Sequence, residues 1–216
     1  MPGTGTVFYM EKRITALEEQ KRNKNRINVY INGSFAFGLS KFIGRNLKEG
    51  QIISDQQIDD LVHKESREKA YQIALRFISY KPRSRYTVEE KLKKSGFSED
   101  IISSVVKEFE EKGYLDDLEY ARQWVDERSS SKPRSRRQLA YELKKLGISE
   151  NLILEALKNA PEDVELAYAL GKKYLRRYQH LDEDSFKKKL FGVLARRAFS
   201  FEVVNRTIDK LAQEKF

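Results

Sequence analysis

The stretch SYKPRSRYTVEEKLKKSGFSEDII begins at Ser79, and SSKPRSRRQLAYELKKLGISENLI follows it from Ser130, 51 residues later. The two stretches align without a gap, so that Lys81 matches Lys132 and Gly96 matches Gly147. The shared positions are those that shape helix cores and turns. Similarity at a fixed period indicates a structural repeat.

Each copy reads as three short helices. Apolar residues at helical spacing run up to the KPRSR segment, where Pro82 ends the first helix. Thr87–Glu90 has the form of a capping box for a second helix, and Gly96 suits the residue after its end. In the next copy, Asp116 or Asp117 is placed to cap the first helix.

A third and less similar copy occupies residues 161–216. Its later positions follow the second copy at the 51-residue offset, whereas its first helix, around Ala167, fits an offset of 46. We therefore place about five extra residues in the connection RRYQHLDED. Copies of this size bury too little apolar surface alone, so we expect them to stack into an elongated, curved array.

Residues 14–45 have a different pattern, in which apolar and polar residues alternate. Asn32-Gly33 between two such runs predicts a hairpin, and a helix at about 56–65 follows. The predicted fold is mainly α, with tandem three-helix repeats and a small β-rich N-terminal module. The expected division is 1–66 for that module and its short helix, then repeats at 67–115, 116–160 and 161–216.

The composition narrows the class of protein. The chain has 42 Lys and Arg against 33 Asp and Glu, a net charge of +9, which favours acidic or polyanionic partners. It has no cysteine, so disulfides and thiolate metal sites are excluded. The sequence contains neither an apolar run long enough to span a membrane nor a signal-peptide pattern, and we expect a cytoplasmic protein.

No catalytic constellation is evident, and we expect neither enzymatic activity, nor a cofactor, nor a bound metal. The only histidines, His63 and His180, lie in different modules, and no P-loop pattern occurs. The acidic clusters Asp116-Asp117 and 182–184 stand at predicted helix starts, where carboxylates cap backbone amides. A metal-dependent nuclease is the alternative that these clusters leave open.

Basic residues recur with the repeat, mainly between the first and second helices and along the second. Stacked copies would bring them into one row, and arginine suits phosphates and carboxylates alike. The alternative is a charged, solvated surface. Tyr114, Tyr120 and Trp124 could stack on nucleic-acid bases, although packing inside the repeats is favoured. The candidate contact residues are Lys81, Arg83, Arg85, Arg128, Lys132, Arg134, Arg136, Arg137, Lys144, Lys145, Arg176, Arg177, Arg196 and Arg197.

GYLDDLEYARQWVDER at 113–128, KPRSRRQLAYELKKLGIS at 132–149 and the preceding RYTVEEKLKKSGFSEDIISSVVKEFEEKGYLDD resemble the RecX family, bacterial regulators of the RecA recombinase. The resemblance covers about 67–160 strongly and 161–216 weakly, and 14–65 is similar to the N-terminal extension of longer members. Ser135 is a departure, because members often have glycine there.

The resemblance implies three tandem three-helix repeats without catalytic activity. It also implies binding along the groove of the RecA–DNA filament, which inhibits RecA's ATPase and strand exchange and so modulates recombination and DNA repair, including the SOS response. We expect a monomer that binds single- or double-stranded DNA weakly on its own. The alternative is a basic helical-repeat protein that binds nucleic acid without a recombinase partner.

Overall fold

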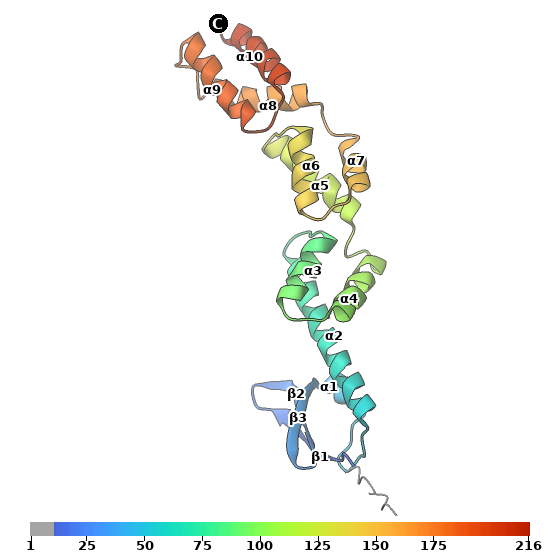
Figure 1. The fold of residues 1–216 in the computed structure, drawn as a ribbon. Helices are drawn as coiled ribbons and strands as arrows, with labels where there is room; N and C mark the ends of the chain where they lie inside the picture. The colour runs from blue at the N-terminus through green and yellow to red at the C-terminus, as the bar shows by residue number, and fades with distance from the viewer. Residues whose placement is uncertain (1–10) are drawn as a thin grey trace, which may run out of the picture. The chain divides into compact units, whose positions relative to one another are not determined.

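The computed structural model describes residues 11–216, which form three strands and ten helices (Figure 1). Two compact units divide this part of the chain. One contains the residues up to Arg76 together with Leu92–Lys107, and the other contains Phe77–Lys91 with Glu108–Phe216. Within residues 11–216, no helix combines the length and the apolar character needed to cross a bilayer.

The N-terminal module is an antiparallel sheet in the order β1 (Ile14–Gln20), β2 (Asn23–Ile31) and β3 (Ser34–Ser40). The predicted hairpin turn is confirmed, because Asn32 and Gly33 join β2 to β3 with φ angles of 49° and 81°. Left-handed conformations at both central residues match the twist of the strands that the turn connects. The core of the sheet is buried and centres on Ile14, Val29 and Leu39.

The short helix α1 (Lys41–Gly44) precedes α2 (Asp55–Ser79), a single helix of 25 residues. We predicted one helix at 56–65 and another from 67, but no proline or glycine interrupts α2, so the backbone hydrogen bonds continue. The predicted boundary at residue 66 therefore falls inside a helix.

Glu65 of α2 is 4% exposed and is held against the sheet. Burial disfavours its charged form, but the Ser40 N–H, which donates to Oε2 at 2.8 Å, and the Arg26 guanidinium, 2.5 Å from Oε1, keep its pKa below the usual value. The charged carboxylate therefore ties α2 to β2 and to the end of β3.

The remaining helices form the repeats, and the predicted mainly α class with three three-helix repeats is confirmed. The first repeat uses the later part of α2 with α3 (Arg85–Lys94) and α4 (Glu99–Glu111). The second uses α5 (Asp117–Ser131), α6 (Arg136–Lys145) and α7 (Glu150–Leu157). The third uses α8 (Asp163–Leu175), α9 (Glu183–Ala195) and α10 (Phe201–Lys215).

The second and third repeats each have a separate apolar core. Leu139 and Leu143 of α6 are fully buried in one, and Phe186 and Leu190 of α9 are fully buried in the other. The second helix of a repeat therefore contributes the central residues of its own core, as expected for units that each bury one layer of side chains.

The turn after the second helix is the same in all three repeats. Gly96, Gly147 and Ala198, spaced by 51 residues, have positive φ angles of 85°, 79° and 61°. Glycine adopts this conformation without steric cost, so the predicted helix ends at Gly96 and Gly147 are confirmed. Ala198 keeps the same turn although its Cβ is disfavoured there.

Candidate cationic interface

The serine of each KPRSR segment is the N-cap of the helix that follows. Ser84 Oγ accepts from the Thr87 N–H at 3.3 Å, and Ser135 Oγ accepts from the Gln138 N–H at 3.1 Å. Both serines are fully buried. The capping box predicted at Thr87–Glu90 is wrong by one turn, because α3 already begins at Arg85 and Ser84 satisfies its free amides.

The same serines contact the next repeat. Ser84 Oγ donates to the carbonyl of Leu146 at 2.7 Å, and the backbone N–H of Ser135 donates to the carbonyl of Arg197 at 3.1 Å. Leu146 and Arg197 are themselves 51 residues apart, so each contact joins equivalent positions. Within the unit that holds these residues, neighbouring copies therefore meet in one register.

Arg85 and Arg136, two of the candidate contact residues, form hydrogen bonds and ion pairs with other residues of the chain. The Arg85 backbone N–H donates to Asp117 at 2.8 Å, and its guanidinium donates to Glu89 at 2.8 Å and Glu110 at 3.2 Å. The hydrogen bond that Arg85 donates to Glu89 is the main reason that the pKa of Arg85 is raised. Arg85 therefore fixes the start of α3 against the start of α5.

Arg136 repeats this arrangement one copy later. Its backbone N–H donates to Asp163 at 2.7 Å, its Nη2 donates to the carbonyl of Leu157 at 2.8 Å, and its Nη1 pairs with Glu162. Asp117 and Asp163 hold equivalent positions at the start of a first helix. We therefore assign both arginines to the joints between repeats.

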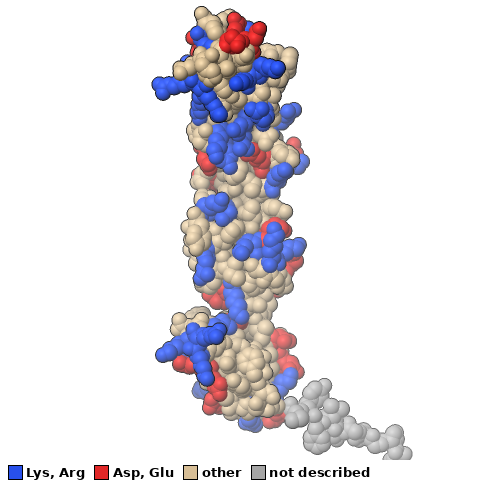
Figure 2. Space-filling view, turned by 90° about the vertical axis from the view of Figure 1, so that its left-hand side faces the viewer, with Lys and Arg blue, Asp and Glu red and all other residues tan. Residues whose placement is uncertain are grey.

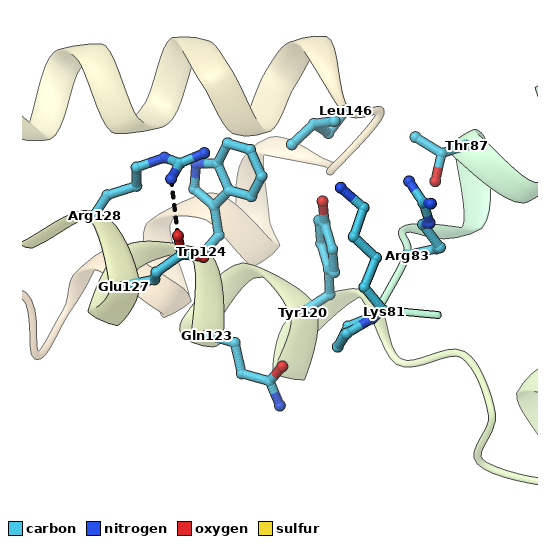
Figure 3. Close-up of a pocket in the computed structure, with 10 residues that line it drawn as sticks. Lys81, Arg83, Thr87, Tyr120, Gln123, Trp124, Glu127, Arg128 and Leu146 are labelled. Carbon is cyan, nitrogen blue, oxygen red and sulfur yellow. Dashed lines mark hydrogen bonds and ion pairs between the residues drawn. The ribbon is translucent and has the colours of Figure 1, made fainter. Parts of the chain in front are cut away.

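A pocket of about 450 Å³ lies beside the first KPRSR segment (Figure 3). Lys81 and Arg83 line it from the connection before α3, and Tyr120, Trp124 and Arg128 line it from α5. The Arg83 guanidinium lies over the Phe77 ring at 4.0 Å, and that of Arg128 lies over the Trp124 ring at 4.2 Å. Cations held on aromatic rings keep a fixed position with part of their donors free.

Glu142 of α6 links several residues of this region. It pairs with Arg134, lies 3.8 Å from Arg128 Nε, and accepts from the indole N–H of Trp124 at 3.2 Å. Burial, and then the neighbouring charges of Arg197 and Arg128, lower the pKa of Arg134. The half-buried carboxylate of Glu142 therefore contacts both Arg134 and Arg128. Because two arginines share one carboxylate, the cluster has a net positive charge.

A second pocket, of about 310 Å³, is lined by Arg134, Gln138, Arg196 and Arg197. We call each of these two pockets, with the basic segment beside it, a corner. The second pocket is the equivalent corner one repeat later, because Arg134 matches Arg83 and Arg197 matches Leu146. On the face drawn in Figure 2, Lys and Arg side chains gather over the third repeat and its border with the second.

The remaining candidates are mostly exposed. Lys145 lies over the Tyr141 ring at 4.5 Å, and Arg177 lies over the Tyr174 ring at 5.9 Å. Across the described residues, no carboxylate partner is found for a group of exposed or half-exposed cations. That group is Lys81, Arg83, Lys132, Arg137, Lys144, Arg176, Arg196 and Arg197.

The acidic clusters act as helix caps, as predicted. Asp116 accepts from the backbone amides of Leu118 and Glu119, both at 2.9 Å, and Asp182 accepts from that of Ser185 at 2.9 Å. Residues 11–216 contain no group of three His, Asp or Glu side chains arranged to hold a metal ion.

Glu142 was missed in the sequence, and the role of Tyr120 and Trp124 was foreseen only in part. Glu142 lies at a position that is Lys91 in the first repeat and Val193 in the third, so no repeated signal marked it. Tyr120 and Trp124 pack against the core of their repeat, as favoured, but they also line the first pocket. Their position beside a repeat joint, next to a basic segment, was the available signal.

Family models of RecX proteins match most of the chain. The "Regulatory protein RecX N-terminal domain" matches residues 12–54. The first, second and third three-helix domains of RecX match residues 70–109, 116–157 and 161–208.

Individual proteins agree with these matches. The chain is 31% identical over 210 residues to a regulatory protein RecX of Bacillus cytotoxicus, covering 94% of this chain and 78% of that one. It is 30% identical over 207 residues to one of Leuconostoc mesenteroides, covering 94% and 77%. The crystal structure of a regulatory protein RecX superposes with a TM-score of 0.66 at 27% identity, covering 92% and 99%. RecX from Lactobacillus salivarius gives 0.58 at 27% identity, covering 68% and 97%.

Proposed function

This chain belongs to the RecX family of regulatory proteins, and we propose that it regulates a RecA recombinase by binding in the groove of the RecA–DNA filament. Binding there inhibits ATP hydrolysis by RecA and strand exchange. The proposal involves no catalytic step by this chain, and places it among the regulators of recombination and DNA repair.

One observation supports this proposal above the others. The corner at Lys81 and Arg83 and the corner at Arg134, Arg196 and Arg197 are equivalent sites one repeat apart, and both carry cations without a carboxylate partner among the described residues. Positive sites that recur with the repeat suit a partner that is itself periodic and anionic. A filament of protein on DNA offers phosphates and acidic side chains at regular intervals.

The test adds the protein to RecA assembled on single-stranded DNA and follows ATP hydrolysis and strand exchange. We expect both to fall as the protein approaches a stoichiometric amount. A variant with Lys132, Arg196 and Arg197 changed to alanine should inhibit less. The matched control changes Lys21 and Arg22 of the β1–β2 turn together with Lys24 at the start of β2, which removes the same charge from another place. Unchanged RecA activity with the unmodified protein would contradict the proposal.

The alternative, binding to nucleic acid without a recombinase, is favoured by the same cations. Salt distinguishes the two. Binding to bare single strands weakens with salt by about 0.7 log units per phosphate contact, so the triple variant should flatten that slope by about 2. Tight binding to bare DNA with no effect on RecA supports the alternative, and weak binding to DNA with tight binding to the filament argues against it.

A further inference from the structure

The pocket beside the first KPRSR segment combines positive charge with two aromatic rings. Figure 3 shows Lys81, Arg83 and Tyr120 on one side of it and Trp124 and Arg128 on the other. The ring centroids of Tyr120 and Trp124 are 6.1 Å apart at an angle of 37°. Its volume of about 450 Å³ lies within the usual range for small-ligand sites.

The cations of this pocket are incompletely satisfied within the protein. Arg83 Nε is buried without a hydrogen-bond partner among the described residues, and Arg128 Nε, which likewise has no hydrogen bond, has only the ion-pair contact with Glu142 at 3.8 Å. Among residues 11–216, Glu127, which accepts from Arg128 Nη1 at 3.0 Å, is the only acidic residue that lines the pocket. Buried donors normally have partners, so the pocket is suited to an anionic group from outside.

The aromatic pair is specific to the second repeat. At the positions of Tyr120 and Trp124, the third repeat has Leu166 and Leu170, which are 2% and 4% exposed and complete an apolar core. Tyr120 and Trp124 instead reach the pocket while they pack against the core of their own repeat. The equivalent second pocket is lined by Arg134, Gln138, Arg196 and Arg197, without an aromatic residue.

We infer that this pocket binds one nucleotide unit of a single-stranded nucleic acid. The phosphate lies at Lys81 and Arg83, and the base lies against Tyr120 and Trp124. Aromatic rings beside a cationic groove are the usual means of holding unpaired bases without sequence preference. The second pocket, with arginines alone, is suited to a phosphate only.

The competing occupant is an acidic peptide. Lysine and arginine bind carboxylates as well as phosphates, but a carboxylate does not stack on the two rings as a base does. The rings therefore favour a base. The inference deepens the proposed function by naming the ligand of one corner, and its test contains no recombinase, so each can fail separately.

Trp124 is the only tryptophan of the chain, so its fluorescence reports directly on this pocket. The probes are oligothymidylate, an abasic oligomer of the same length, and oligoglutamate. We expect oligothymidylate to quench Trp124, and the abasic oligomer to bind about five- to 150-fold more weakly, because base stacking is lost. Equal binding of the two oligomers, or tighter binding of oligoglutamate, would overturn the inference.

Variants locate the binding. Tyr120→Leu copies the third repeat, keeps the tryptophan probe, and should weaken oligothymidylate about five- to 150-fold. Lys81→Ala should lower the salt slope by about 0.7. Lys21→Ala, at a turn residue that does not line this pocket, is the matched control and should leave quenching by short oligomers unchanged. An unchanged affinity in Tyr120→Leu would exclude stacking in this pocket, and circular dichroism confirms that each variant is folded.

Discussion

Gly147→Ala should disrupt the joint between the first and second repeats, and Gly96→Ala should not. Both glycines end a second helix with positive φ, at 79° and 85°. A Cβ at Gly96 would meet no atom of the described residues within 4 Å, whereas a Cβ at Gly147 would lie 2.2 Å from Tyr86 Cβ and 2.5 Å from its Cγ. The two substitutions therefore share the same backbone strain and differ in one contact.

The cost follows from this geometry. The left-handed conformation costs an alanine about 1 kcal/mol in either place. Carbon atoms pack at about 3.5–4.0 Å, so the start of α3 must move by about 1.5 Å, because the Cβ of Tyr86 cannot rotate away. Such overpacking costs about 1–3 kcal/mol, and the hydrogen bond from Ser84 to the Leu146 carbonyl, another 1 kcal/mol, is strained with it.

Thermal unfolding followed by far-ultraviolet circular dichroism measures the difference. We expect Gly147→Ala to be about 3 kcal/mol less stable than Gly96→Ala, which is a Tm lower by about 6–12 °C for a chain of this size. Tyr86→Gly removes the atoms that clash, so in a double-mutant cycle the excess cost should disappear. Equal Tm values for the two alanine variants would refute this account of the joint.

Three further substitutions test the caps, the third turn and the buried carboxylate. Ser84→Ala should cost about 2 kcal/mol in urea unfolding, because a cap and a hydrogen bond to the next repeat are lost, whereas Ser149→Ala, at an exposed cap without a side-chain bond, should cost a few tenths. Ala198→Gly should raise stability by about 0.5 kcal/mol, since relief of the left-handed strain exceeds the added entropy of the unfolded chain; an unchanged or lower urea midpoint would contradict this. Glu65→Gln should cost about 3 kcal/mol at neutral pH, because a buried ion pair is broken. The pKa of Glu65 is lowered in the folded chain, so its contribution to stability is fully present above about pH 4.3 and is lost as the pH falls through the folded pKa. The stability difference between the unmodified protein and Glu65→Gln should therefore shrink in acid. A difference that stays constant with pH would contradict a stabilising role of the charged carboxylate.

Much of the fold could be predicted because it depends on local chemistry. The hairpin at Asn32-Gly33 and the helix ends at Gly96 and Gly147 follow from residues that tolerate positive φ. The junction inside α2 was mispredicted because a change of module left no breaker in the chain. Ser84 was overlooked as a cap because Thr87–Glu90 offered a matching pattern one turn later.

The candidate site was harder to predict than the fold. Arg83 and Arg85 stand two residues apart in one basic segment, yet Arg83 lines a pocket and Arg85 is held by Glu89 and Glu110. The sequence of a segment gives the number of its charges, but it does not show which of them pair with a carboxylate from another helix. Glu142, which holds Arg134, comes from the interior of α6 and has no counterpart in the other repeats.

The amino-acid sequence by itself determined the period, the helix ends at Gly96 and Gly147 and the hairpin, because these depend on spacing and on side chains that act on their own backbone. It also determined the excess of positive charge. Only the tertiary structure decided which cations remain available and which fix the joints, since a charge is neutralised by neighbours in space. The pairing of Tyr120 and Trp124 with Lys81 and Arg83 in one pocket was likewise decided only when the joint between two repeats brought the connection before α3 against α5.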